Sequence, residues 1–93
     1  MQATEFLVQR ASDTLAAPLA EGRALLDVKQ GMYFGLDLVG GRIWELLSEP
    51  IRFSEIATAI VNEFEVERAV AEADIRAFLE ELQRHNLVRT TPV

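Results

Sequence analysis

The stretch Met32-Tyr33-Phe34-Gly35-Leu36-Asp37 decides the fold of this 93-residue chain. Its first five residues are the most aromatic segment of the sequence, and a short run of this kind favours a β-strand. Asp37 is a good helix N-cap, and the apolar side chains of Ile43, Trp44 and Leu47 recur on one face of the helix that would follow. The sequence therefore predicts a strand over 32–36 that leads directly into a helix over 38–48.

The residues upstream of this strand predict two further strands. Thr14–Leu19 is a weakly apolar run that ends at the turn signal Ala20-Glu21-Gly22, and Arg23–Val28 follows it. Lys29-Gln30-Gly31 is a short polar turn with a glycine, which suits a hairpin to the strand at 32–36. Three strands joined by short turns predict an antiparallel meander.

The residues downstream predict two more helices and a second pair of strands. Pro50 ends the first helix, Ser54 is the expected N-cap of a helix over Glu55–Phe64, and Asn86 is the expected stop of a third helix that begins near Arg68. The short extended segments Ile51–Phe53 and Leu87–Thr91 are expected to pair as the wing of a winged helix-turn-helix.

We therefore expect an α+β fold, in which a three-stranded antiparallel sheet packs on a trihelical winged helix-turn-helix bundle. The whole chain, 1–93, is expected to form one domain, with the sheet at about 14–36 and the winged-helix part at about 38–91. No repeat, linker or low-complexity tract marks a domain boundary.

Composition limits the classes of function. The net charge is −6, and Ser54–Asn86 contains eight acidic residues against three arginines, so this segment repels phosphate backbones. There is no cysteine, which excludes disulfides and thiolate metal sites. Neither a signal peptide nor an apolar run long enough for a membrane helix is visible, so we expect a cytoplasmic protein.

Residues with catalytic chemistry have structural interpretations here. His85 is the only histidine and is expected in the last turn of the third helix, where the helix dipole favours a cation. The neighbouring carboxylates Glu80 and Glu81 point in different directions on a helix and lie on a solvated face. Gly40-Gly41 belongs to no phosphate-loop motif and indicates close packing of the first helix on the sheet. We therefore expect no catalytic residue, no metal site and no cofactor.

The aromatic residues of the third strand are more informative. Tyr33 and Phe34 are adjacent, so one faces the core and the other lies on the outer face, although the sequence does not decide which. An aromatic strand with an open edge is a template for strand addition by a peptide, unless terminal residues cover it. Phe78 lies at the margin of the apolar stripe of the third helix, and it belongs either to the core or to a groove beside the third strand.

Several of these segments, in this order and spacing, resemble the PqqD-like family of peptide-recognition elements. The resemblance covers roughly Leu15 to Val88. It is carried by Met32–Asp37, Gly41–Leu47, Phe53-Ser54-Glu55-Ile56, Phe64-Glu65-Val66, Asp74–Leu82 and Leu87-Val88.

The resemblance implies a stand-alone element that binds the leader segment of a ribosomally synthesised precursor peptide by β-strand addition. It would present that peptide to a leader peptidase, a cyclase or a radical SAM enzyme. The Tyr-Phe-Gly-Leu type of strand is more similar to the elements of lasso-peptide clusters than to those of pyrroloquinoline quinone synthesis. The peptide-binding residues implied are Met32, Tyr33, Phe34, Gly35, Leu36, Asp74 and Phe78.

Two alternatives belong to other classes of function. A winged helix often binds DNA, but the expected recognition helix has no lysine or arginine between Ser54 and Glu67 and makes poor phosphate contacts. Another small protein-interaction module would need no special site. An enzyme is disfavoured by the single histidine and the lack of a nucleophile motif. The oligomeric state is left open between a monomer and a weak dimer.

Overall fold

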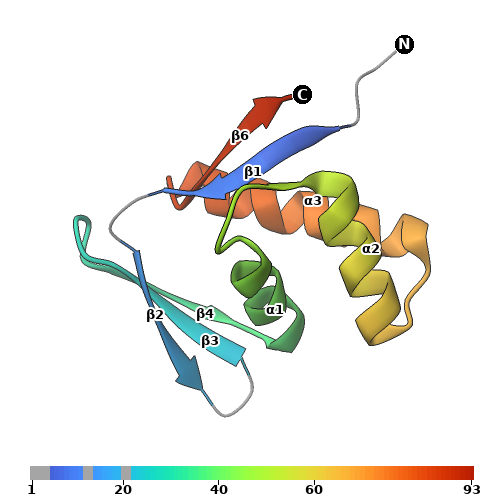
Figure 1. Ribbon diagram of the computed structural model, residues 1–93. Helices are drawn as coiled ribbons and strands as arrows, with labels where there is room; N and C mark the ends of the chain where they lie inside the picture. The colour runs from blue at the N-terminus through green and yellow to red at the C-terminus, as the bar shows by residue number, and fades with distance from the viewer. Residues whose placement is uncertain (1–4, 12–13, 20–21) are drawn as a thin grey trace.

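The computed structural model describes residues 5–11, 14–19 and 22–93. They form an α+β fold with three helices and two three-stranded antiparallel sheets (Figure 1). The first sheet has the order β5-β1-β6 and the second the order β2-β3-β4. The elements are β1 (Phe6–Arg10), β2 (Thr14–Leu19), β3 (Gly22–Asp27), β4 (Met32–Leu36), α1 (Leu38–Leu46), β5 (Ile51–Arg52), α2 (Phe53–Phe64), α3 (Arg68–Arg84) and β6 (Val88–Pro92).

The predicted meander is confirmed in β2, β3 and β4. In the turn between β3 and β4, Gly31 has a positive φ of 67°, and its N–H donates to the Asp27 carbonyl at 2.8 Å. The buried Asp27 carboxylate accepts hydrogen bonds from the backbone and side-chain nitrogens of Gln30 at 3.2 and 2.6 Å. Polar turn chemistry thus fixes the register of the hairpin. Of the turn predicted at Ala20-Glu21-Gly22, the first two residues lie outside the described part of the chain.

The predicted wing is wrong in its pairing. β5 and β6 do not pair with each other, because β1 lies between them and pairs antiparallel with both. β1 was not predicted, since the partners of Phe6–Arg10 are 43 or more residues away and no hairpin turn lies near it. Val8, at its centre, is fully buried, so this strand contributes to the core as well as to the sheet.

The predicted helices are confirmed with changed ends. Asp37 is the N-cap of α1, as its side chain accepts from the Gly40 N–H at 2.7 Å. Ser54 is not the cap of α2: the helix begins at Phe53, its N-cap is Arg52, and the Ser54 hydroxyl instead donates to Glu5 at 2.6 Å. Asn86, with a φ of 62°, terminates the α3 segment in the left-handed conformation.

The core lies between the helices and the inner faces of both sheets. Trp44, which belongs to the apolar face predicted for this helix, is 1% exposed, and the Arg10 guanidinium lies 4.4 Å from the centre of its ring. Gly41 packs α1 against β3, because a Cβ there would lie 3.0 Å from the Arg23 side chain. Figure 1 shows the result: β3 and β4 lie beside α1, while β6 lies beside α3 and β1 beside α2.

Candidate functional site

β4 is an edge strand with one side open. Within the described part of the chain it pairs only with β3, from Met32 opposite Asp27 to Leu36 opposite Arg23. The other edge of this sheet is β2, which contains Pro18. Proline has no backbone N–H, so β2 offers an incomplete ladder to an added strand. β4 contains no proline and is the edge of this sheet on which a further strand can pair.

The two faces of β4 are now assigned. Tyr33 is 65% exposed and lies on the outer face, in register with Leu26 of β3 and through it with Leu15 of β2. Phe34 is half-buried and packs against the core cluster. The structure therefore answers the question that the sequence left open: Phe34 faces inward and Tyr33 outward. No described residue covers Tyr33.

One side of α3 faces the region next to β4. Asp74, Phe78, Glu81 and His85 follow one another at intervals of four, three and four residues, which places them along one face of the helical segment. This face adjoins the core stripe without belonging to it, since the fully buried residues of α3 occupy other positions. That core stripe consists of Ala71, Ile75, Leu79 and Leu82.

His85 connects the end of α3 to β4. Its ring centre lies 4.8 Å from that of Phe34, with the planes tilted by 56°. The His85 carbonyl accepts a hydrogen bond from the Gln30 side chain at 3.3 Å, and its Nε2 lies 3.2 Å from Glu81 Oε2. These contacts hold the β3–β4 hairpin against the C-terminal end of α3. They set the position of one end of β4 relative to the helix.

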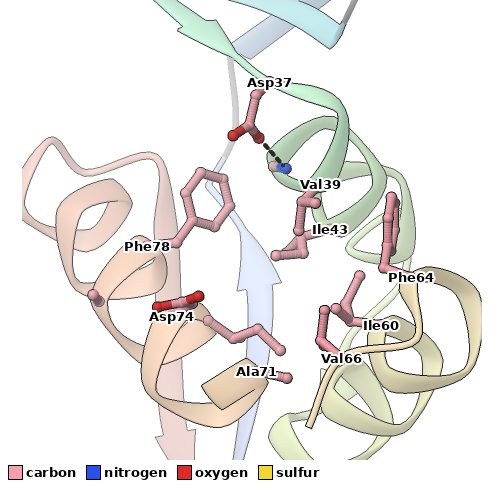
Figure 2. A pocket seen from close by; sticks show the side chains of 12 residues that line it. Asp37, Val39, Ile43, Ile60, Phe64, Val66, Ala71, Asp74 and Phe78 are labelled. Carbon is pink, nitrogen blue, oxygen red and sulfur yellow. Dashed lines mark hydrogen bonds between the residues drawn. The ribbon is translucent and has the colours of Figure 1, made fainter. Parts of the chain in front are cut away.

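A hollow of about 400 Å³ lies where β4 passes into α1, between α1, the end of α2 and α3 (Figure 2). Phe78 and Asp37 stand at its side nearest to β4. Gly40 permits this arrangement, because a Cβ at that position would lie 3.2 Å both from Phe78 Cε1 and from Asp37 Oδ1. The walls are formed by Asp37, Val39, Gly40, Ile43, Ile60, Phe64, Val66, Ala71, Asp74, Ile75, Ala77 and Phe78.

The structure brings together some of the predicted site residues but not all. Asp74 and Phe78 line the same hollow, and Phe78 is half-buried and also packs against the core cluster. Met32, Tyr33 and Gly35 are exposed on the strand and do not line the hollow, while Leu36 is buried in the core.

Sequence reasoning did not name Asp37, which lines the hollow, or His85, which contacts Phe34 of β4, among the site residues. Asp37 was interpreted only as a helix cap and His85 only as a helix end. The spacing of His85 from Phe78, seven residues, was a signal that both share one helix face.

His85, the only histidine of the sequence, lies beside this region. Its side chain contacts Glu81 and Phe34, which orient it. Among the residues described, no three histidine, cysteine, aspartate or glutamate side chains are grouped as a metal would require. No helix in this part of the chain combines the length and apolar character needed to cross a membrane. The region thus combines the unpaired edge of β4 with a hollow that is lined by apolar and acidic side chains.

Comparisons with known proteins identify the family and the fold of this chain. Residues 22–88 match the family model described as Coenzyme PQQ synthesis protein D (PqqD). The fold is similar to a solved structure described as TbiB1 in complex with the TbiA(beta) leader peptide. The TM-score is 0.80 and the sequence identity 40%, over 87% of this chain and 94% of that chain.

A second solved structure is described as lasso peptide synthetase B1 complexed with the leader peptide. It has a TM-score of 0.74 and 26% identity, over 88% of this chain and 96% of that one. No curated protein sequence gives a significant match.

Proposed function

The chain belongs to the PqqD family, and we propose that it binds the leader segment of a ribosomally synthesised precursor peptide in natural-product biosynthesis. The observation that carries this proposal is the open edge of β4, which lies beside the face of α3 that carries Asp74, Phe78, Glu81 and His85. Both solved structures to which it is similar are described as complexes with a leader peptide. One of them is a lasso peptide synthetase component, which supports a lasso-type pathway rather than synthesis of pyrroloquinoline quinone.

The proposed mode of binding is strand addition. The leader pairs antiparallel along Met32–Leu36 and extends the sheet to four strands, using main-chain hydrogen bonds that depend little on its sequence. Specificity then comes from side chains beside the strand, for which we propose Phe34 on β4 and Asp74 and Phe78 on α3. Phe34 and Phe78 are half-buried, so each offers a preformed apolar surface without exposing the whole ring.

We propose a non-catalytic role in which the bound leader is presented to a separate enzyme, without a cofactor. That enzyme is a leader peptidase, a cyclase or a radical SAM enzyme. The row formed by Leu15, Leu26 and Tyr33 supports such a contact, since these side chains are 60, 42 and 65% exposed and adjoin the strand that the leader would extend. A Leu26→Ser variant should keep its affinity for the leader while leader removal by the partner peptidase slows.

We further propose that residues 1–93 form one domain and that α1, α2 and α3 with β5 and β6 are a winged helix-turn-helix whose wing is completed by β1. The order of the elements supports this interpretation. The same order would favour DNA binding, but α2 lacks basic residues, and Arg68 at the start of α3 is bound to Glu72 at 2.9 Å. Charge therefore supports the peptide-binding role over a DNA-binding one.

The experiment uses the TbiA(beta) leader peptide as the probe in calorimetric titrations of the wild-type protein and two proline variants. Successive N–H groups of a strand point to opposite edges, so one of Tyr33 and Phe34 donates toward β3 and the other toward the open edge. Proline at the residue whose N–H points toward β3 should unfold the sheet. Proline at the residue whose N–H points toward the open edge should leave the fold intact and remove a donor to the leader.

We expect one of Tyr33→Pro and Phe34→Pro to keep a wild-type circular dichroism spectrum and to lose leader binding. A Leu15→Ala variant on β2 is the control, because it alters the opposite edge strand and should bind like the wild type. The proposal fails if the wild-type protein does not bind the peptide, or if a folded proline variant binds it with unchanged affinity.

A further inference from the structure

The hollow at the end of β4 has the chemistry of a site for a cationic side chain. In Figure 2 the ring of Phe78 lies between the carboxylates of Asp37 and Asp74. The face of an aromatic ring attracts a cation, and carboxylates are the strongest partners for ammonium and guanidinium groups. Within the part of the chain that the structure describes, Asp74 has no hydrogen bond and no ion pair. This carboxylate is therefore available to a ligand.

The floor of the hollow is apolar. Val39, Ile43, Ile60 and Ile75 line it together with Phe64. Such a floor suits the methylene stem of a long side chain, because lysine and arginine cover apolar surface with their stems and keep the charged group at the polar end. Here the polar end is the mouth, where the two carboxylates are exposed. The combination of an apolar floor and an acidic mouth thus matches an amphipathic cation.

On the premise that the leader binds as proposed above, we infer that this hollow receives one arginine or lysine side chain of the leader peptide. The stem packs on the apolar floor, and the charged group lies against the face of the Phe78 ring at the mouth, which the carboxylates of Asp37 and Asp74 flank. The site is continuous with the peptide-binding edge, because Asp37 follows directly on Leu36, the last residue of β4.

The position of this residue in the leader follows from the strand direction. β4 runs from Met32 to Leu36, and an antiparallel leader therefore has its N-terminal end beside Leu36 and Asp37. The cationic residue belongs on the N-terminal side of the segment that pairs with β4. The long-range electrostatic field of the protein also favours a cationic residue in the leader, since the chain carries a net charge of −6 and its excess of acid lies largely in the α2–α3 region.

The test is a selection from random peptides displayed on yeast, with the fluorescently labelled protein as the bait. Three proteins are compared: the wild type, the double variant Asp37→Asn/Asp74→Asn, and the double variant Glu49→Gln/Glu80→Gln. Asparagine is as good an N-cap as aspartate, so α1 keeps its cap. The second pair removes the same two charges from exposed carboxylates that do not line the hollow, and it serves as the matched control.

In sorts with the wild type and with the control, we expect enriched peptides to carry arginine or lysine at one fixed position N-terminal to an alternating strand-like segment. In sorts with Asp37→Asn/Asp74→Asn that preference should disappear while the strand-like segment remains. One selected peptide is then synthesised in two forms, with its cation and with norleucine in place of the cation. The norleucine form should bind the wild type about tenfold more weakly than the cationic form, and the Asp37→Asn/Asp74→Asn variant about twofold more weakly or less.

Two contrary outcomes are separable. If peptides with a strand-like segment are enriched without a preferred cation, or with the same preference in both double variants, the inference about the hollow is wrong and leader binding stands. If no peptide is enriched by the wild type, the proposed peptide-binding function itself is refuted and the inference falls with it.

Discussion

Replacing Phe78 by alanine tests whether α3 forms one wall of the peptide site. Phe78 is half-buried and lies close to the start of α1, because a Cβ at Gly40 would be 3.2 Å from its Cε1. A fully buried phenylalanine costs about 3–5 kcal/mol on truncation to alanine, so a half-buried one should cost about 2 kcal/mol. A domain of this length has about 5–14 kcal/mol of stability. The variant should therefore remain folded.

The effect on binding should be larger than the effect on the fold. A central aromatic anchor at an interface contributes about 2 kcal/mol or more, which corresponds to about a thirtyfold loss of affinity. The assay is calorimetric titration of the TbiA(beta) leader peptide, after circular dichroism has shown that the variant is folded. Phe6→Ala is the matched control, because Phe6 is also half-buried but stacks on Phe53, outside the proposed site. An affinity of Phe78→Ala within twofold of that of Phe6→Ala would refute a role for this wall.

Four further variants or conditions test other parts of the account. Trp44→Ala should cost about 3–5 kcal/mol and lower the melting temperature by well over 10 °C in a thermal scan, because Trp44 is 1% exposed; melting within two degrees of wild type would contradict its burial. Gly22→Ala should yield unfolded or aggregated protein by circular dichroism, since the new Cβ would lie 1.8 Å from the Leu36 carbonyl oxygen at a φ of 136°; a folded variant would show that this contact can relax. Hydrogen bonds from Ser54 lower the pKa of Glu5, so its contribution is present at neutral pH and disappears as the pH falls through the lowered pKa; Glu5→Gln should melt below wild type at pH 7, the difference in melting temperature should shrink as the pH is lowered through the acidic range, and a difference that stays constant with pH would count against this pairing. Duplex DNA should give no sequence-dependent binding in fluorescence anisotropy at physiological salt, and a sub-micromolar affinity would establish a second function.

Local patterns predicted the elements that local chemistry determines. The meander, the cap at Asp37 and the burial of Trp44 depend on turn residues, on one carboxylate and on helical periodicity, all within a few positions of each other. These features could be predicted from the sequence because the interactions that fix them are short in range.

The features that were missed depend on contacts between distant segments. β1 pairs with strands that begin at Ile51 and Val88, and nothing within Phe6–Arg10 specifies those partners. Ser54 would be a good cap in isolation, but Glu5, 49 residues earlier in the chain, binds its hydroxyl and its N–H. In such cases tertiary pairing overrides the local propensity.

The candidate site shows the same division. The open edge of β4 was predicted from an aromatic strand, whereas the inward direction of Phe34 depends on its packing beside His85, 51 residues later. The hollow required Asp37 to meet Asp74 and Phe78, which only the packing of α1 against α3 brings about. Sequence reasoning could name the strand but not the pocket at its end.

The central claim is that a leader peptide adds as a strand to β4, and nuclear Overhauser contacts test it most directly. The isotope-labelled protein is saturated with unlabelled TbiA(beta) leader, and contacts between Hα protons of the two chains are recorded. Antiparallel pairing brings Hα protons of non-hydrogen-bonded residue pairs close together. The account predicts such contacts at every second residue of Met32–Leu36. Leader contacts confined to β6, β2 or α2, with none to the Hα protons of β4, would contradict it.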